Sequence, residues 1–335
     1  MSMAHALHLP SHMQRVLVVG GAGLVGSHLV DRLLAEGNEV IAIDDLSRGS
    51  YASLAHLRRE KRFVFLEHDV TRPFRVKVDA VFHLAVPSTR MACEPDPVKA
   101  AMTCVVGTMH VLEVAAASGA RVVFVTATER WGEGARCAEA LAVDFAKSCG
   151  AEVRVVRQPS AYGPRMAPDG DHIVTELVLQ ALRGEDLTPR ARLGRRLRLS
   201  YVDDVVETLA RTMNSEQHTP AVVAPSSEST VLDLAHLIAE AAGLEGVEIS
   251  DASGDGPPSA PMSGRPTLVD TLPASIALGL ASSMELEEGL RRTVAWFDAR
   301  TSRRAGDRPS GVYVRGAREE RQTIPAEAPS SVCAR

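Results

Sequence analysis

Short apolar runs alternate with longer amphipathic segments along the first half of the chain. Continuous apolar runs are typical of parallel strands covered on both faces, and apolar residues at helical spacing are typical of helices that pack on a sheet. This alternation predicts an α/β fold, a Rossmann-type doubly wound parallel sheet. Strands are expected at 16–19, 39–43, 63–66, 80–86, 121–127 and 152–157, with helices before Gly37, at 98–118 and at 136–149.

The pattern changes after Arg157, where loops and amphipathic helices follow without further long apolar runs. Helices are expected at 173–184, 230–243 and 285–300, with a strand that enters a helix at 196–212. These segments predict a smaller, substrate-binding C-terminal lobe. We expect a flexible N-terminus at 1–13, a sheet domain at 14–157 to which the chain returns near 198–224, the lobe at 158–300, and a disordered tail at 301–335, which has few large apolar residues.

Composition narrows the class of protein. The chain has 335 residues, 45% of them hydrophobic, and a formal net charge of −5, which does not resemble a basic nucleic-acid footprint. Its 5 cysteines lack metal-ligand spacing, so we expect reduced thiols, no metal and a cytoplasmic protein. The N-terminus does not resemble a signal peptide, and no apolar run is long enough to predict a membrane span.

The turn after the first strand carries the clearest motif. Gly20, Gly23 and Gly26 form G-x-x-G-x-x-G between a predicted strand and a predicted helix, the context of a dinucleotide pyrophosphate site. Asp44 ends the next strand, where a carboxylate accepts hydrogen bonds from the adenosine ribose and repels a 2′-phosphate. The motif therefore predicts NAD rather than NADP.

Further cofactor contacts are expected around this turn. Asp45 and Arg48 are placed to line the ribose, or else are solvated loop charges. Asp69 is placed to contact the adenine edge, or else forms a turn. The remaining predicted contacts are Leu24, Val25, Val70, Leu84 and Ala85.

Several motifs in the same order carry a family resemblance. They are the glycine turn with Asp44, "HDVTRP", "VFHLA", "DPVKAAMTCVVGT", "YGPRM", "ALRGEDLT", "YVDDVVE" and "LEEGLRRT". Together they resemble the extended short-chain dehydrogenase/reductases, and among these the UDP-glucuronate decarboxylases (UDP-xylose synthases). The resemblance implies a UDP-sugar substrate that is oxidised at C4, decarboxylated and reduced again with NAD. It also implies a Tyr-x-x-x-Lys pair in which the Tyr takes the C4 hydroxyl proton.

That pair is missing from the sequence. The 4 tyrosines are followed four residues later by Ala55, Met166, Val205 and Ala317, so no Tyr-x-x-x-Lys occurs. Aligned with the family, the chain lacks a loop here, with Trp131 at the Tyr position and Ala135 at the Lys position. An indole has no titratable group, so Trp131 cannot act as a base.

Candidate replacements lie on the same strand end. Thr128 and Glu129 match a Ser/Thr-Glu pair that the resemblance places beside the sugar carboxylate. Glu129 is either a base with a raised pKa or an inherited, solvated residue. His83 is a candidate acid–base group or, as the resemblance favours, a structural histidine, and Cys93 and Cys104 are buried apolar residues or nucleophiles.

An arginine-rich segment at 190–200 suits a diphosphate clamp or a solvated basic loop. Arg196 and Arg198 flank Leu197, where the resemblance implies a substrate arginine. The other predicted substrate contacts are Ser160, Arg165 and Arg265.

These observations leave two alternative hypotheses for the function of the protein. One is an NAD-dependent sugar-nucleotide enzyme, a lyase or isomerase, with non-standard acid–base residues. The other is a non-catalytic subunit that binds NAD or a nucleotide sugar and pairs with an active homologue. The resemblance implies pairing through the helices at 98–118 and 136–149, as a homodimer or a heterodimer.

Overall fold

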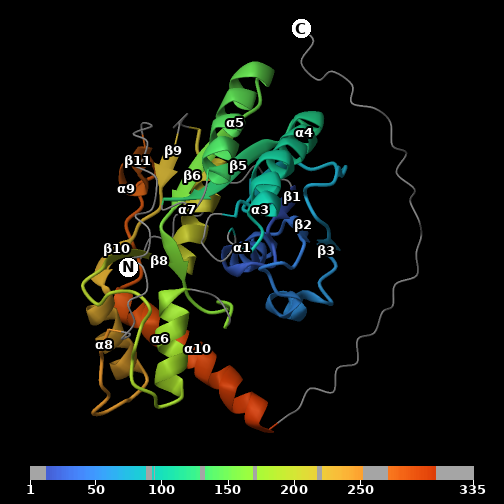
Figure 1. Cartoon of the computed structure of the whole chain (residues 1–335). Helices are drawn as coiled ribbons and strands as arrows, with labels where there is room; N and C mark the ends of the chain where they lie inside the picture. The colour runs from blue at the N-terminus through green and yellow to red at the C-terminus, as the bar shows by residue number, and fades with distance from the viewer. Residues whose placement is uncertain are drawn as a thin grey trace, which may run out of the picture.

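In the described part of the chain, eight parallel strands form the main sheet, in the order β11-β9-β6-β5-β4-β1-β2-β3 (Figure 1). The computed structural model describes residues 13–87, 93, 95–128, 133–168, 172–216, 221–251 and 271–306. The strands are β1 Arg15–Val19, β2 Glu39–Asp44, β3 Phe63–Glu67, β4 Ala80–His83, β5 Arg121–Ala127, β6 Val153–Gln158, β9 Ala221–Val223 and β11 Thr271–Pro273. The strand order reverses between β1 and β4, which is the switch point where ligands of such folds bind.

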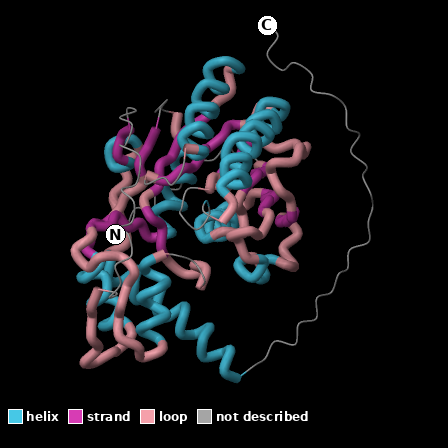
Figure 2. The backbone as a smooth tube through the Cα atoms, viewed as in Figure 1, coloured by secondary structure: helices cyan, strands magenta, loops and turns pink. Residues whose placement is uncertain are grey.

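Helices cover both faces of this sheet (Figure 2). Val16 and Val18 of β1 point into a core formed with α1 (Leu24–Ala35) and α7 (Val202–Asn214). Leu17 and Val19 point the other way, against α4 (Thr108–Ser118) and α5 (Gly134–Cys149). Alternate residues of one strand thus enter two cores, which explains its unbroken apolar run and confirms the doubly wound prediction.

The helix predicted at 98–118 consists of α3 (Pro97–Met102), a π-helical turn η3 (Thr103–Gly107) and α4. Within the described residues, this stretch alone is long and apolar enough to cross a membrane by length and composition. Val111 and Leu112, which belong to this stretch, are fully buried in the core. A helix in the core of a protein can pass the same test of length and composition.

A second sheet, in the order β10-β8-β7, belongs to the smaller lobe. The lobe also contains the helices α6, α8 and α10, which lie together at one end of the molecule in Figure 1. The bounds are β7 Ser160–Tyr162, β8 Arg196–Tyr201, β10 Ser227–Thr230, α6 Ile173–Leu182, α8 Val231–Ala241 and α10 Leu286–Gly306. Short elements complete the chain: η1 Tyr51–Ser53, η2 Ala55–Leu57 and α9 Ala274–Ala277.

β8 lies in the small sheet, and α7 and β9, both within the range 198–224, bring the chain back to the main sheet. Two details differ from the sequence-based expectations. β4 ends at His83, three residues earlier than 80–86 implies. α10 continues to Gly306, so 301–306 is helical; the rest of the predicted tail and nearly all of 1–13 lie outside the described residues.

Candidate functional site

The glycine turn between β1 and α1 is closely packed on two sides. Gly20 has φ +84°, and a Cβ there would lie 3.1 Å from the backbone nitrogen of Ala85. A Cβ on Gly26 would lie 2.1 Å from the Gly20 carbonyl oxygen, so only glycine lets α1 approach the turn this closely. The two positions fix the shape of the turn.

Gly23 has a different role, because the space in front of it is open. A Cβ on Gly23 would meet one atom within 4 Å, the Gly20 carbonyl oxygen at 3.4 Å. Gly23 is the N-cap of α1, and no side chain caps this helix. The N–H groups of the first turn and the helix dipole therefore remain available to a phosphate.

Asp44 lies at the end of β2 and holds the glycine turn. Its Oδ2 accepts from Ala22 N at 2.9 Å and its Oδ1 accepts from Leu46 N at 2.9 Å. Burial raises the pKa of Asp44, and the two N–H donors oppose that rise. Each carboxylate oxygen has a second lone-pair site, which a ribose hydroxyl can use.

The neighbouring loop charges differ in their surroundings. Asp45 forms an ion pair with Lys99 of α3 at 3.1 Å and accepts from the Ser47 hydroxyl. Although partial burial raises the pKa of Asp45, the Ser47 hydrogen bonds and the Lys99 ammonium bring it below the usual value. Arg48 is exposed. Lys99 was not anticipated, because it lies on a helix far along the sequence.

Asp69 and Val70 follow β3. The Asp69 side chain accepts from the backbone N–H and the hydroxyl of Thr71, both within 2.9 Å, which is the turn geometry that the sequence also allowed. Val70 is buried, and its carbonyl oxygen lies 2.9 Å from His110 Nδ1. Leu84 and Ala85 are half-buried and follow β4 beside Gly20.

His83 is a structural residue in this arrangement. It is fully buried, its Nε2 lies 3.0 Å from Thr108 Oγ1, and its ring packs edge-on against Phe124. Burial lowers its pKa to about 3. The imidazole is therefore neutral at physiological pH and too enclosed to exchange a proton with a substrate.

The predicted catalytic strand end is only partly described. Thr128 is half-buried, and its backbone nitrogen donates to the Gln158 carbonyl oxygen at 2.8 Å. Glu129 and Trp131 lie outside the described residues. Ala135 is 1% exposed in the first turn of α5, beside Gly134, where a Cβ would lie 3.2 Å from Cys104 Cβ.

Cys93 and Cys104 are both buried, which agrees with the first of the two interpretations of these cysteines. Cys93 is 8% and Cys104 1% exposed. Burial raises the pKa of the Cys104 thiol to about 12, and that of Cys93 also rises. Neither thiol is a nucleophile at neutral pH, because the thiolate is the reactive form.

The predicted substrate residues are distributed over the lobe. Ser160, the first residue of β7, is exposed, and its Oγ lies 2.7 Å from Nε2 of His172. Arg165, at φ +71°, donates to the Ser27 carbonyl oxygen and to Asp31, both on α1. Arg165 thus ties the lobe to the sheet domain, while Arg265 lies outside the described residues.

Arg196 and Arg198 share the exposed face of β8. Both form ion pairs with Glu228 of β10, at 3.9 Å and 3.0 Å, whereas Leu197 between them is buried. The face toward the core therefore carries leucine at the position where the resemblance implies an arginine. The paired guanidinium groups lie on the opposite face.

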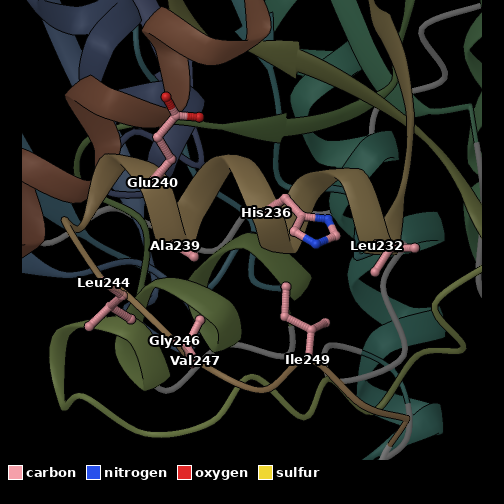
Figure 3. A pocket seen from close by; sticks show the side chains of 8 residues that line it. All are labelled: Leu232, His236, Ala239, Glu240, Leu244, Gly246, Val247 and Ile249. Carbon is pink, nitrogen blue, oxygen red and sulfur yellow. The ribbon is translucent and has the colours of Figure 1, made fainter.

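A separate hollow of about 520 Å³ lies between α8 and the segment 244–249 (Figure 3). His236 and Glu240 of α8 line it together with apolar residues such as Leu244 and Ile249. It contains none of the predicted cofactor or substrate residues. In the described part of the chain, no cluster of three or more His, Cys, Asp or Glu side chains suits a metal ion.

Comparison with known proteins decides the family. The model described as "NAD dependent epimerase/dehydratase family" matches residues 16–224. The chain belongs to this family. UDP-glucuronic acid decarboxylase 6 of Arabidopsis thaliana is 35% identical over 302 residues, covering 82% of this chain and 86% of that protein. UDP-glucuronic acid decarboxylase 1 of Xenopus tropicalis is 32% identical, covering 85% and 72%.

Solved structures agree on the fold. UDP-glucose 4-epimerase from Thermotoga maritima, solved with UDP-glucose, matches with a TM-score of 0.70 and 26% identity, covering 86% of this chain and 99% of that one. The Bordetella bronchiseptica enzyme WbmF, solved with NAD⁺ and UDP, matches with a TM-score of 0.71, covering 86% and 93%. Its 23% identity supports the likeness of fold alone.

NAD is the cofactor of this epimerase/dehydratase family, and the residues present fit it. Gly23 leaves room for the pyrophosphate, the uncapped α1 supplies N–H donors, and Asp44 supplies ribose acceptors. These parts were predicted from the glycine motif. Sequence reasoning missed Lys99 and His172. Lys99 lies within the quoted segment "DPVKAAMTCVVGT", but nothing in that segment pairs it with Asp45, and His172 belongs to none of the quoted motifs.

Proposed function

We propose that this protein binds NAD and a UDP-linked sugar at the carboxyl ends of the main strands, and that its decarboxylase-type turnover is altered or lost. The family membership and the similarity to UDP-glucuronic acid decarboxylases support the ligand class. The absence of Tyr-x-x-x-Lys from the sequence supports the change in chemistry.

The environment of Ala135 carries this proposal. At the position aligned with the family lysine stands a methyl side chain that is almost fully buried. The adjoining Gly134 packs so closely that a Cβ would lie 3.2 Å from Ala101 Cα of α3. The first turn of α5 thus packs against α3 and carries no lysine side chain.

Proton transfer then depends on few groups. NAD, when bound, accepts and returns the hydride at the sugar carbon. Thr128 can hold the sugar hydroxyl, but a threonine hydroxyl is not a base near neutral pH. His83 is excluded by its burial and its pKa of about 3. Glu129 is the carboxylate left at this strand end, and losing a positioned acid–base group typically costs about 10²–10⁴ in rate.

Product analysis tests the proposal. The purified protein is incubated with NAD⁺ and UDP-glucuronate, and UDP-pentose and CO₂ are measured by mass spectrometry. Glu129→Gln is compared with Glu245→Gln, which changes an exposed glutamate of the lobe. Slow turnover that Glu129→Gln alone abolishes supports a carboxylate base. No turnover with NAD still bound supports lost activity, whereas fast turnover unaffected by Glu129→Gln contradicts the proposal.

A second candidate is a non-catalytic subunit that pairs with an active homologue through α3, α4 and α5. Val98 and Met102, one turn apart on α3, are 73% and 47% exposed, which is unusual for large apolar side chains in one patch. Co-purification with an active relative, and stimulation of its turnover, would support this candidate. A cytoplasmic location remains part of both proposals.

A further inference from the structure

β3 forms one edge of the main sheet, and its outer side has unused backbone groups (Figure 1). The carbonyl oxygen of Arg62, just before the strand, accepts from β2 at 2.8 Å. Because alternate residues of a strand point their backbone groups to opposite sides, Phe63, Phe65 and Glu67 point theirs away from the sheet. Within the described part of the chain, only the Phe63 N–H among these groups has a partner, the Glu60 carbonyl oxygen at 3.3 Å.

The side chains of β3 also lack the usual protection of a sheet edge. Val64 and Leu66 lie on the same face of the strand and are 48% and 38% exposed. Natural edge strands are commonly kept short or carry proline or lysine. The opposite edge strand, β11, has three residues and ends in Pro273, whereas β3 has five residues and contains neither proline nor lysine. An exposed apolar edge of this kind is a surface for pairing with another strand.

The charges at the two ends of β3 are complementary to those of an antiparallel copy of the same strand. Lys61 lies two residues before the strand, Glu67 is its last residue, and both are exposed. Neither side chain forms an ion pair with another described residue. When identical strands pair antiparallel, a two-fold axis relates them, so each contact occurs twice. A pairing centred on Val64 therefore places Lys61 of each copy opposite Glu67 of the other.

The same register uses the free backbone groups. It places Phe63 of one copy opposite Phe65 of the other, and both residues point their N–H and C=O groups outward. Such a pair exchanges two backbone hydrogen bonds in an antiparallel ladder. Val64 then faces Val64 of the other copy in a pair without hydrogen bonds, where side chains are closest. The exposed apolar side chains of the two copies thus cover one another.

We propose that the outer edge of β3 pairs antiparallel with β3 of a second copy of this chain, centred on Val64, and joins two main sheets into one. This surface is separate from that of α3, α4 and α5, and the inference goes beyond the proposed function. Two five-residue strands bury far less surface than a stable dimer needs. The association is therefore weak, and it adds to the state found in dilute solution as the protein concentration rises.

Charge reversal tests the register. Lys61→Glu and Glu67→Lys each place like charges opposite each other twice when two identical copies pair, whereas a mixture of the two variants restores both pairs of opposite charge. Sedimentation at rising protein concentration measures association of the wild type, each variant and the mixture, and the melting temperature checks folding. Each variant alone should associate about tenfold more weakly than the wild type, because like charges directly opposite destabilise a strand pair. The mixture should recover the wild-type association.

Cysteine cross-linking tests the centre of the pairing. Val64→Cys places two thiols directly opposite each other, so mild oxidation should link two copies through a disulfide. Leu66→Cys is the matched control, because Leu66 is also exposed but faces Arg62 of the other copy. The wild type, oxidised in the same way, gives the background from its own exposed Cys137.

Four results would each overturn the inference: a wild-type mass that does not rise with concentration, a mixture that associates no better than its components, cross-linking of Val64→Cys no greater than that of Leu66→Cys, or a different protein bound at this edge in place of a second copy. The proposed function would stand after any of them, because its ligand site does not include the outer edge of β3.

Discussion

The Asp44 carboxylate accepts a hydrogen bond from the backbone N–H of Ala22 at 2.9 Å, which joins the end of β2 to the glycine turn. One side chain thus shapes the pyrophosphate turn and presents oxygens to the ribose. Replacing Asp44 by Asn puts an amide donor opposite the N–H of Ala22 or Leu46, and both contacts cannot then be kept. Loss of one of these hydrogen bonds should disturb both the glycine turn and the contact with the ribose.

We expect Asp44→Asn to weaken NAD⁺ binding by roughly tenfold or more, in line with the loss of hydrogen bonds to a charged group. Calorimetric titration with NAD⁺ and NADP⁺ checks this. Asp45→Asn is the matched control, because Asp45 pairs with Lys99 and does not hold the turn. Equal losses in the two variants would contradict the assignment of Asp44.

Substitutions at two glycines of the turn should have different effects, one on stability and the other on NAD⁺ binding. We expect Gly26→Ala to destabilise the protein by at least about 2 kcal/mol, because its Cβ would lie 2.1 Å from the backbone oxygen of Gly20. Gly23→Ala should melt like the wild type but lose NAD⁺ affinity, since its Cβ fills only the open space. Thermal melting with and without NAD⁺ measures both. Wild-type NAD⁺ affinity in Gly23→Ala would show that the cradle lies elsewhere.

Most of the main sheet could be predicted because its central strands β1, β4 and β5 contain apolar runs whose residues alternate between two cores. We did not assign the strand β8 to a sheet from the sequence, although its residues hold the relevant signal. Arg196, Leu197, Arg198 and Leu199 alternate between exposed and buried, the pattern of a sheet with one face in solvent. Attention to this alternation would have placed β8 outside the main sheet.

The candidate site was predictable only where a motif coincides with a local turn. Gly20, Gly23 and Asp44 are fixed by the strand–turn–helix unit that contains them. His172 was missed because its contact with Ser160 depends on where α6 begins relative to β7. No spacing in the sequence encodes that relationship, since it is created by packing between separate elements.

The buried ion pair between Glu139 of α5 and Arg157 of β6 links the helix that begins at Gly134 to the sheet. Their side chains are 8% and 6% exposed. We expect Arg157→Met to destabilise the protein by about 3–5 kcal/mol, because it removes the guanidinium that pairs with the buried carboxylate of Glu139. Chemical denaturation measures the free energy of unfolding. The double variant Arg157→Met with Glu139→Leu should regain much of the loss, and equal stability of single and double variants would contradict this account.

His83 should make the fold acid-sensitive. Its pKa in the folded state, about 3, is lowered by burial from 6.5, so the unfolded chain binds the proton more tightly. The free energy of unfolding therefore keeps its full value above about pH 6.5 and falls as the pH drops toward 3. Between pH 6.5 and 5, protonation of His83 in the unfolded chain lowers this free energy by on the order of 2 kcal/mol.

His83→Gln, which stays neutral, should show a flatter dependence of unfolding free energy on pH across this window. Denaturant titrations at several pH values provide the measurement. His28, whose pKa burial also lowers, contributes with the same sign in both proteins, so the comparison isolates His83. Parallel pH profiles for wild type and variant would show that His83 does not carry the effect.

The exposed patch on α3 should control assembly. We expect Val98→Glu with Met102→Lys to convert a dimer into a monomer without lowering the melting temperature, because both side chains are exposed in the single chain. Light scattering after size exclusion gives the mass. Ile276→Glu on α9 is the control, since Ile276 is 70% exposed but lies outside these helices. A wild type that is already monomeric would remove the homodimer from consideration.

The residues of the glycine turn fit NAD, whereas the sequence contains no Tyr-x-x-x-Lys pair. The most direct test of this combination is to add UDP-glucuronate to the NAD⁺-loaded protein and to record, in one sample, the heat of binding and the absorbance of NADH. We predict saturable binding with no NADH, or NADH that forms slowly and disappears in Glu129→Gln. Rapid NADH formation that is independent of Glu129, or no binding of either NAD⁺ or UDP-glucuronate, would contradict the account.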